Sequence, residues 1–160
     1  MHVIASKAVA FKEALEPDFK RYQQQIIMNS QALAERLLEW GFSLVSGGTD
    51  THLLLVDLRG SHEDLTGKEA EQVLERAGMT VNKNTVPGES RPPFVTSGLR
   101  IGTAAVTTRG LGESEMRQIA DWIARVLARP SSEKVIEATR REVETMCEAF
   151  PIYQELITPF

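Results

Sequence analysis

The feature that most constrains the fold of this sequence is a long stretch of helical periodicity near its start. After Pro17, apolar residues recur at steps of three to four, with polar residues between them: Phe19, Tyr22, Ile26, Leu33 and Leu37. This spacing predicts an amphipathic α-helix, and Gly41 predicts its end. Another helix precedes it, with a boundary at Glu16–Pro17, because proline disfavours helical geometry in the residue before it but fits the first turn of a new helix.

Short apolar runs separated by turn-forming residues follow this helical segment. Phe42–Val45 and His52–Leu58 are predicted strands, and the glycine-rich residues 46–50 between them predict a turn. Thr66–Glu69 matches a capping box, in which the threonine oxygen and the glutamate carboxylate each accept a hydrogen bond from a free backbone N–H, so a helix is predicted to begin there. The remaining predicted elements are strands at Thr80–Val81 and Leu99–Thr103 and helices at about residues 113–127 and 132–150.

The order of these elements predicts the fold class. Helix, strand, strand, helix, strand, strand, helix, helix indicates an α+β fold: a small sheet of three to four mostly antiparallel strands with helices on one face. A long N-terminal helix precedes this unit. We expect three parts, namely a helical segment at residues 1–40, an α/β small domain at 41–153 and a tail at 154–160.

Composition and charge exclude several classes of protein. The chain is 42% hydrophobic and 25% charged, as in soluble globular domains, and its net charge of −4 with no basic stripe argues against a nucleic-acid partner. No segment approaches the ~20 apolar residues of a membrane span and no secretory leader is visible, so we expect a cytoplasmic protein without membrane contact. The single cysteine, Cys147, excludes an internal disulfide, and no residues have metal-ligand spacing, so no metal is expected.

The strongest candidate for chemistry is the long loop predicted at residues 82–97. Asn82–Thr85 bring amide, ammonium and hydroxyl groups together, and Pro92, Pro93 and Phe94 form a stiff apolar edge. Loops of this length within a compact domain are usually functional or disordered. The residues alone therefore predict a candidate site for an anion or an amphipathic small ligand.

The strand after this loop carries Arg100 between Gly98 and Gly102. Glycine in a strand often marks close approach by another backbone or by a ligand. An arginine on a strand is well placed to donate two parallel hydrogen bonds to a carboxylate. The alternative is that Arg100 forms an intradomain salt bridge and that the prolines only stiffen the loop. Composition and spacing favour neither interpretation.

Six motifs, in order, resemble serine hydroxymethyltransferase, and the likeness extends to about Tyr153. They are Met1–Ala10, Ser46–His52, Leu65–Ala70, Thr80–Asn84, Phe94–Thr103 and Thr107–Gly110. Thr51, Pro92 and Ala104 depart from the residues common in that family, as does the loop segment Gly88–Arg91.

The resemblance implies specific roles in the transfer of a one-carbon unit from serine to tetrahydrofolate, which yields glycine. It implies that Arg100 binds the carboxylate of serine or glycine and that Asn84 contacts the pteridine of tetrahydrofolate. It also implies that Pro92, Pro93 and Phe94 line the folate site. The family holds its cofactor, pyridoxal 5'-phosphate, on a lysine in a T-T-T-H-K motif, which this sequence lacks.

These implications predict a C-terminal small domain that is catalytically inert without the large domain of the same enzyme, to which residues 1–40 would lead. The alternatives are a freestanding carboxylate- or metabolite-binding module without catalysis and a stable fragment with no independent role. The opening helix is apolar on more than one side, which predicts self-association in a homo-oligomer. The residues concerned are Val3, Ile4, Ala8, Val9 and Phe11.

Overall fold

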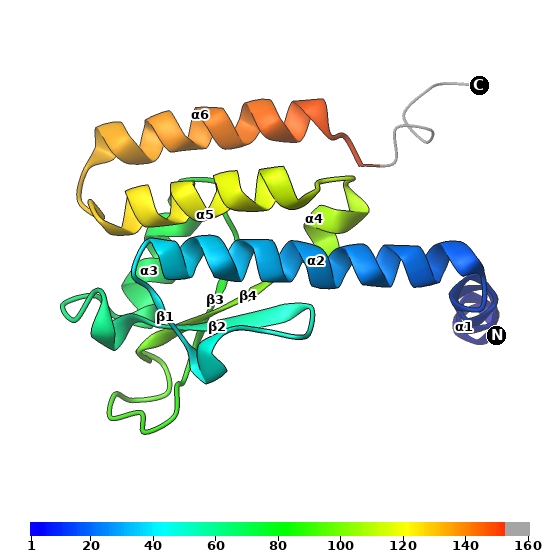
Figure 1. Cartoon of the computed structure of the whole chain (residues 1–160), viewed down its shortest axis with the longest axis horizontal. Coiled ribbons are helices and arrows are strands. Elements are labelled where there is room, and N and C mark those ends of the chain that lie inside the picture. Colours follow the sequence, from blue (N-terminus) through cyan, green and yellow to red (C-terminus); the bar gives the residue numbers. More distant parts are fainter. Residues whose placement is uncertain (153–160) are drawn as a thin grey trace.

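A computed structural model of the chain describes residues 1–152, so the predicted tail at 154–160 lies outside the described residues. Two helices come first, the second longer than the first and set at an angle to it, and a small sheet with four further helices follows (Figure 1). The helices are α1 (His2–Ala14), α2 (Pro17–Glu39), α3 (Gly67–Arg76), α4 (Ala104–Thr108), α5 (Glu113–Leu127) and α6 (Glu133–Ala149). The strands are β1 (Ser43–Leu44), β2 (Leu53–Asp57), β3 (Asn82–Asn84) and β4 (Gly98–Gly102).

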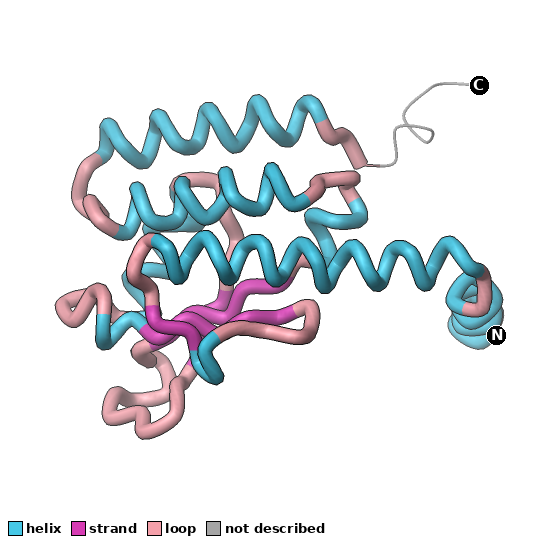
Figure 2. The backbone as a smooth tube through the Cα atoms, in the orientation of Figure 1, coloured by secondary structure: helices cyan, strands magenta, loops and turns pink. Residues whose placement is uncertain are grey.

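The four strands form one antiparallel sheet in the order β1-β2-β4-β3. Arg100 in β4 lies opposite Leu55 in β2 and opposite Asn82 in β3. The helices lie on one side of the sheet (Figure 2). This arrangement confirms the predicted α+β class, with a small antiparallel sheet and an N-terminal helical segment.

The core lies between the sheet and the helices. α2 and α3 pack against the sheet, α5 packs beside α2, and α6 covers α3 and α5 from outside (Figure 1). The second half of α2 belongs to this core, because its apolar stripe is buried from Ile26 to Leu37. Fully buried side chains from each layer meet there, among them Leu33, Val56, Leu74, Leu99, Met116 and Ile123.

Several local predictions are confirmed. The first helix ends before Glu16 and the second begins at Pro17. Gly41, just after α2, has φ +82°, a left-handed conformation that favours glycine. The capping box at Thr66 and Glu69 is formed: the Glu69 N–H donates to Oγ1 of Thr66 at 3.1 Å, and the Thr66 N–H donates to Oε2 of Glu69 at 2.9 Å.

Two local predictions are wrong or incomplete. The third strand is not Thr80–Val81 but Asn82–Asn84, because pairing with β4 outweighs the low strand propensity of asparagine, while Val81 is buried in the core. The loop therefore begins at Thr85 rather than at Asn82. The helix α4 was not predicted, since five residues are too few to show a periodic pattern.

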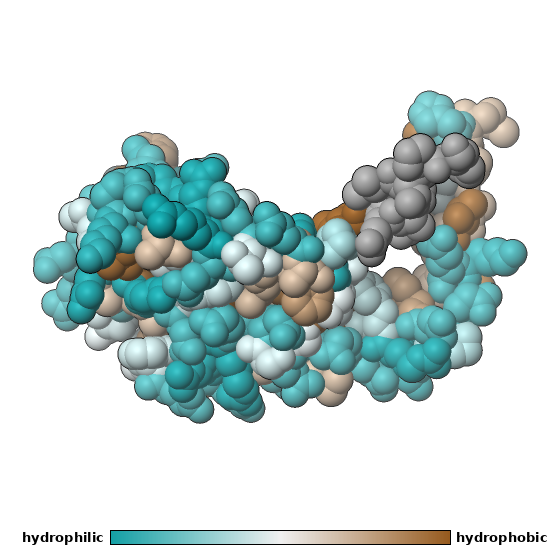
Figure 3. Space-filling model, turned by 90° about the horizontal axis from the view of Figure 1, so that it is seen from above, coloured by the Kyte–Doolittle hydropathy of each residue, from teal (hydrophilic) through white to brown (hydrophobic). Residues whose placement is uncertain are grey.

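α1 protrudes from the end of α2 and buries none of its residues. Hydrophobic surface is visible on this protruding end of the molecule (Figure 3). Its most exposed apolar side chains are Val3, Ile4, Val9 and Phe11. Within residues 1–152, no helix is both long and apolar enough to cross a membrane.

Candidate functional site

The strand β4 presents Arg100 on the face of the sheet that the helices leave open. Side chains alternate along a strand, and the neighbours Leu99 and Ile101 are buried on the helical side, so Arg100 is exposed on the opposite side. Its Nη2 donates to Oδ1 of Asn82 at 3.3 Å. No carboxylate of the described residues lies within 4 Å of its guanidinium. Arg100 therefore forms no intradomain salt bridge with the described residues.

The two glycines that flank Arg100 are explained by packing within the sheet. A Cβ at Gly98 would lie 2.7 Å from the carbonyl oxygen of Val56 and 3.0 Å from that of Asn84. A Cβ at Gly102 would lie 3.0 Å from Cδ2 of Leu53. The close approach predicted at these positions thus comes from the neighbouring strands and, at Gly98, also from Cγ1 of Val86, which would lie 2.5 Å from the added Cβ. Small residues on both sides also leave the Arg100 side chain free of bulky neighbours on its own strand.

The structure separates the polar residues that are adjacent in the sequence of β3. Asn82 and Asn84 lie opposite Arg100 and Gly98, so both asparagines share the open face with Arg100. Asn84 is half-buried, and its amide nitrogen donates to the carbonyl oxygen of Thr85 at 2.8 Å. No described residue donates a hydrogen bond to the side-chain oxygen of Asn84.

Lys83 takes no part in this open face. It alternates with the two asparagines, and its Nζ lies 3.1 Å from Oε2 of Glu71 on α3. Its backbone N–H donates to Oε1 of the same carboxylate at 2.9 Å, and this bond is the leading cause of the lowered pKa of Glu71. The ammonium group therefore fastens β3 to α3, which removes Lys83 from the predicted grouping of four polar residues.

The loop at residues 85–97 joins β3 to β4 and displays its prolines at the surface. Pro92, Pro93 and Phe94 are exposed, with 73% of the Phe94 side chain accessible to solvent. The carbonyl oxygen of Pro92 accepts hydrogen bonds from the N–H groups of Val95 (2.9 Å) and Thr96 (3.1 Å), which closes a tight turn around Phe94. The apolar edge is thus a defined turn that offers one aromatic ring to solvent.

Glu89 organises this loop, and the sequence patterns did not single it out. Its Oε1 accepts hydrogen bonds from the N–H groups of Ser90 and Arg91, both at 3.0 Å, and from the Ser97 hydroxyl at 2.7 Å, while Oε2 accepts the Ser97 N–H at 2.8 Å. Burial raises the pKa of Glu89, but these hydrogen bonds outweigh it and lower the pKa to about 2. The only sequence signal was an acidic residue between glycine and serine in a turn-rich segment.

Two arginines fasten the loop to the rest of the domain. Arg59 donates to the carbonyl oxygens of Pro87 (2.8 Å) and Gly88 (2.9 Å), and its ion pair with Asp57 is the leading cause of the lowered pKa of that carboxyl group. Arg91 donates to carbonyl oxygens that precede α3, those of Leu65 and Glu63, both at 3.0 Å. The first half of this long loop is therefore bonded both to Arg59, just after β2, and to the segment that precedes α3.

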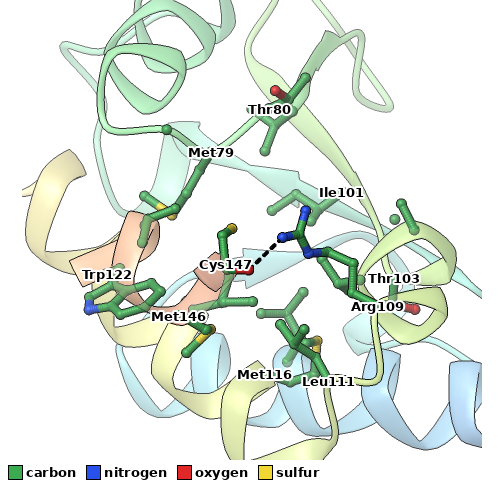
Figure 4. A pocket seen from close by; sticks show the side chains of 18 of the residues that line it. Met79, Thr80, Ile101, Thr103, Arg109, Leu111, Met116, Trp122, Met146 and Cys147 are labelled. Carbon is green, nitrogen blue, oxygen red and sulfur yellow. Dashed lines mark hydrogen bonds between the residues drawn. The ribbon is translucent and has the colours of Figure 1, made fainter. Parts of the chain in front are cut away.

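An apolar cavity of about 320 Å³ lies on the helical side of the sheet, away from Arg100 (Figure 4). Ile101, Met116, Trp122 and Cys147 line it, as does Arg109. Arg109 donates to the carbonyl oxygens of Cys147 (2.8 Å) and Phe150 (3.0 Å), so it caps the C-terminal end of α6. The described residues that line the cavity include no candidate acid–base pair, and Arg109 has a structural role.

The residues described do not fit pyridoxal 5'-phosphate. A lysine that forms a Schiff base needs a pocket that holds its amine unprotonated. Lys83 is paired with Glu71, the other lysines are exposed, and none lines the cavity of Figure 4; they are Lys7, Lys12, Lys20, Lys68 and Lys134. Among residues 1–152 no cluster of His, Cys, Asp or Glu could hold a metal ion.

Comparison with known proteins identifies relatives that match nearly the whole chain. The family model of serine hydroxymethyltransferase matches residues 1–123. A serine hydroxymethyltransferase of Halorhodospira halophila is 58% identical over 153 residues, which are 96% of this chain and 36% of the relative. Those of Natronomonas pharaonis and Coxiella burnetii are 56% identical, over 96% and 98% of this chain. The chain spans 36–37% of the length of these relatives, and it belongs to the serine hydroxymethyltransferase family.

Proposed function

We propose that this chain supplies the substrate-carboxylate and folate subsites of a serine hydroxymethyltransferase. The single observation that carries the proposal is the placement of Arg100: exposed on the open sheet face, with one amide contact to Asn82 and no carboxylate partner in the described part of the chain. The enzyme would interconvert serine and glycine and transfer the one-carbon unit to tetrahydrofolate. The small domain would be residues 41–153, and residues 1–40 would lead to the large domain.

Arg100 would bind the carboxylate of the amino acid. Its planar guanidinium can donate two parallel hydrogen bonds to the two carboxylate oxygens, and each charge-assisted bond contributes about 1.5–3 kcal/mol. The backbone beneath it is held on both sides by strands, which limits the directions the side chain can take. A carboxylate bound in this way fixes the orientation of the amino acid, and orientation decides which bond to its α-carbon can react.

Asn84 and the turn Pro92–Phe94 would bind the folate. The amide nitrogen of Asn84 donates to the carbonyl oxygen of Thr85. The amide oxygen of Asn84 can accept a hydrogen bond from a pteridine N–H. The exposed ring of Phe94 offers an apolar face for the flat part of the ligand. Asn84 is the last residue of β3 and pairs with Gly98, the first residue of β4. The loop that carries Phe94 leaves the sheet at this same end.

Pyridoxal 5'-phosphate would be held by the large domain, since no lysine of this chain suits it. The chain alone is therefore expected to be inert. If lysine-dependent absorbance changes appeared when the isolated chain was mixed with the cofactor, that expectation would be wrong.

The proposal can be tested in a chimera in which this chain replaces its counterpart in the 58% identical relative of Halorhodospira halophila. We expect the chimera to convert serine and tetrahydrofolate. Arg100→Lys loses the two-pronged grip, so kcat/KM for serine should fall about tenfold to hundredfold, in line with the loss of one charge-assisted bond.

The matched control is Arg141→Lys on the exposed side of α6, which removes the same group from a loose pair with Glu137 at 3.8 Å. Its kcat/KM should equal that of the unsubstituted chimera. A chimera whose use of serine is insensitive to Arg100→Lys would refute the carboxylate role. Saturable binding of serine to the isolated chain would favour the freestanding binding module instead.

A further inference from the structure

The four hydrogen bonds of Glu89 connect parts of the loop that lie far apart along it. Ser90 and Arg91 precede the turn Pro92–Phe94, and Ser97 follows it and leads into β4. One carboxylate thus joins the two sides of the turn at its base. Because an ionised carboxylate only accepts hydrogen bonds, all four of these donors can be satisfied at once.

We propose that Glu89 is the positioning residue of the folate subsite, which holds the turn Pro92–Phe94 at a fixed place relative to the end of β4. This inference rests on the proposed function. Glu89 is not expected to touch a ligand, since its two oxygens are directed to the loop's own donors. Its effect on binding comes from preorganisation: a turn that is already ordered loses less conformational entropy when a ligand binds.

The other attachments of the loop do not replace this one. Arg59 holds Pro87 and Gly88, and Arg91 reaches toward α3, so both fasten the side of the loop that precedes the turn. On the other side, the carbonyl oxygens of Val95, Thr96 and Ser97 accept hydrogen bonds from the N–H groups of Lys68, Gly67 and Leu58, each at 3.0 Å. Among the described residues, only Glu89 connects the two sides directly through a side chain, so its loss should loosen the turn without releasing the whole loop.

Arg100 should be insulated from this change. Its strand is paired along its full length with β2 on one side, and from Gly98 to Arg100 with β3 on the other. Loosening the turn therefore predicts a selective defect, in which the folate subsite suffers and the carboxylate subsite does not. A general loss of stability would affect both substrates alike.

The decisive variant is Glu89→Gln in the chimera described above. Glutamine has nearly the same shape, but its NH₂ group would face either the Ser97 N–H or the cluster of donors at Oε1, so at least one bond is replaced by a contact between two donors. We expect KM for tetrahydrofolate to rise about tenfold or more, because a binding group that is displaced by about 1 Å contacts its ligand much less well. KM for serine should change less than twofold.

Two further variants separate positioning from other causes. Glu75→Gln removes the same charge from the exposed face of α3 and should leave both KM values unchanged. Glu89→Asp keeps a charged, accept-only group and should recover most of the affinity for tetrahydrofolate. Equal losses in Glu89→Asp and Glu89→Gln would overturn the proposal, as would an unchanged KM for tetrahydrofolate in Glu89→Gln.

Failure of this inference is distinguishable from failure of the proposed function. If Arg100→Lys impairs the use of serine but Glu89→Gln leaves folate binding intact, only the role of Glu89 is refuted. In the isolated chain, amide hydrogen exchange at Ser90, Arg91 and Ser97 should be faster in Glu89→Gln. Unchanged exchange there would refute the positioning role even if the chimera were inactive.

Discussion

Arg100 and Glu89 carry opposite charges only eleven positions apart in the sequence, and their surroundings are opposite. Arg100 is exposed and makes one long contact with an amide oxygen, whereas Glu89 accepts four hydrogen bonds from the loop around it. A charged group left without a partner on an ordered strand is available to a ligand. A charged group surrounded by donors stabilises local structure.

Glu89 makes the loop sensitive to acid. Its pKa is lowered from an ordinary 4.5 to about 2 in the folded chain, with the nearby Arg59 remaining charged throughout. Its stabilising contribution is fully present above about pH 4.5 and is lost as the pH falls through 2, because the unfolded chain takes up the proton first. Urea unfolding between pH 7 and pH 2.5 should show that wild type and Glu89→Gln converge in free energy of unfolding as the pH falls. A difference that is constant with pH would contradict this.

At the scale of elements, the start of α3 and the end of the loop are built against each other. The N–H groups of Gly67 and Lys68 donate to the carbonyl oxygens of Thr96 and Val95, both at 3.0 Å. Thr96 is buried, has φ +59° and has an Oγ1 without a hydrogen-bond partner among the described residues. A β-branched residue is strained in this left-handed conformation, so the packing around it must hold it there.

Gly67→Ala tests how closely these elements pack. An added Cβ would lie 2.2 Å from Oγ1 of Thr96 and 2.6 Å from the carbonyl oxygen of Gly98, which forces the helix and the loop apart. We expect a loss of about 1–3 kcal/mol in the free energy of unfolding, measured by urea denaturation. The control is Gly48→Ala, whose Cβ would meet nothing within 4 Å and which should change stability by less than about 0.5 kcal/mol. Equal effects of the two substitutions would show that the contact is not tight.

At the scale of the whole molecule, the chain has an ordered body and an uncovered arm. The body buries the apolar residues of every layer, while α1 buries none of its residues and exposes apolar side chains (Figure 3). The relatives are nearly three times as long as this chain, and we propose that in a full-length enzyme other parts of the protein cover the arm.

In the isolated chain, the uncovered arm should cause self-association. The apolar surface of α1 favours burial against a second copy, so the sedimentation coefficient should rise with protein concentration. Replacing Ile4, Val9 and Phe11 together by serine should abolish the rise. The same triple change should leave the thermal unfolding of the body almost unaltered, because none of these residues is buried. A monomer at all concentrations would contradict the expectation.

Much of the fold could be predicted because its signals are local. Apolar spacing in α2 and α5, the break at Pro17, the glycine after α2 and the capping box at Thr66 each act within a few residues. The family could be predicted as well, because its motifs are read directly along the chain.

Other features depend on which strands become neighbours, and only the tertiary structure decided them. Pairing with β4 moved the third strand to Asn82–Asn84 and turned Lys83 toward Glu71, although strand propensity favoured Thr80–Val81. The open environment of Arg100 likewise depends on the side of the sheet that the helices cover. The bonds between Glu89 and Ser97 form because the loop folds back on itself, and periodicity carries no information about such contacts. The sequence by itself determined the longer helices, the ends at Gly41 and Thr66 and the family, because these signals act within a few residues. Packing between distant segments determined which charges stay free.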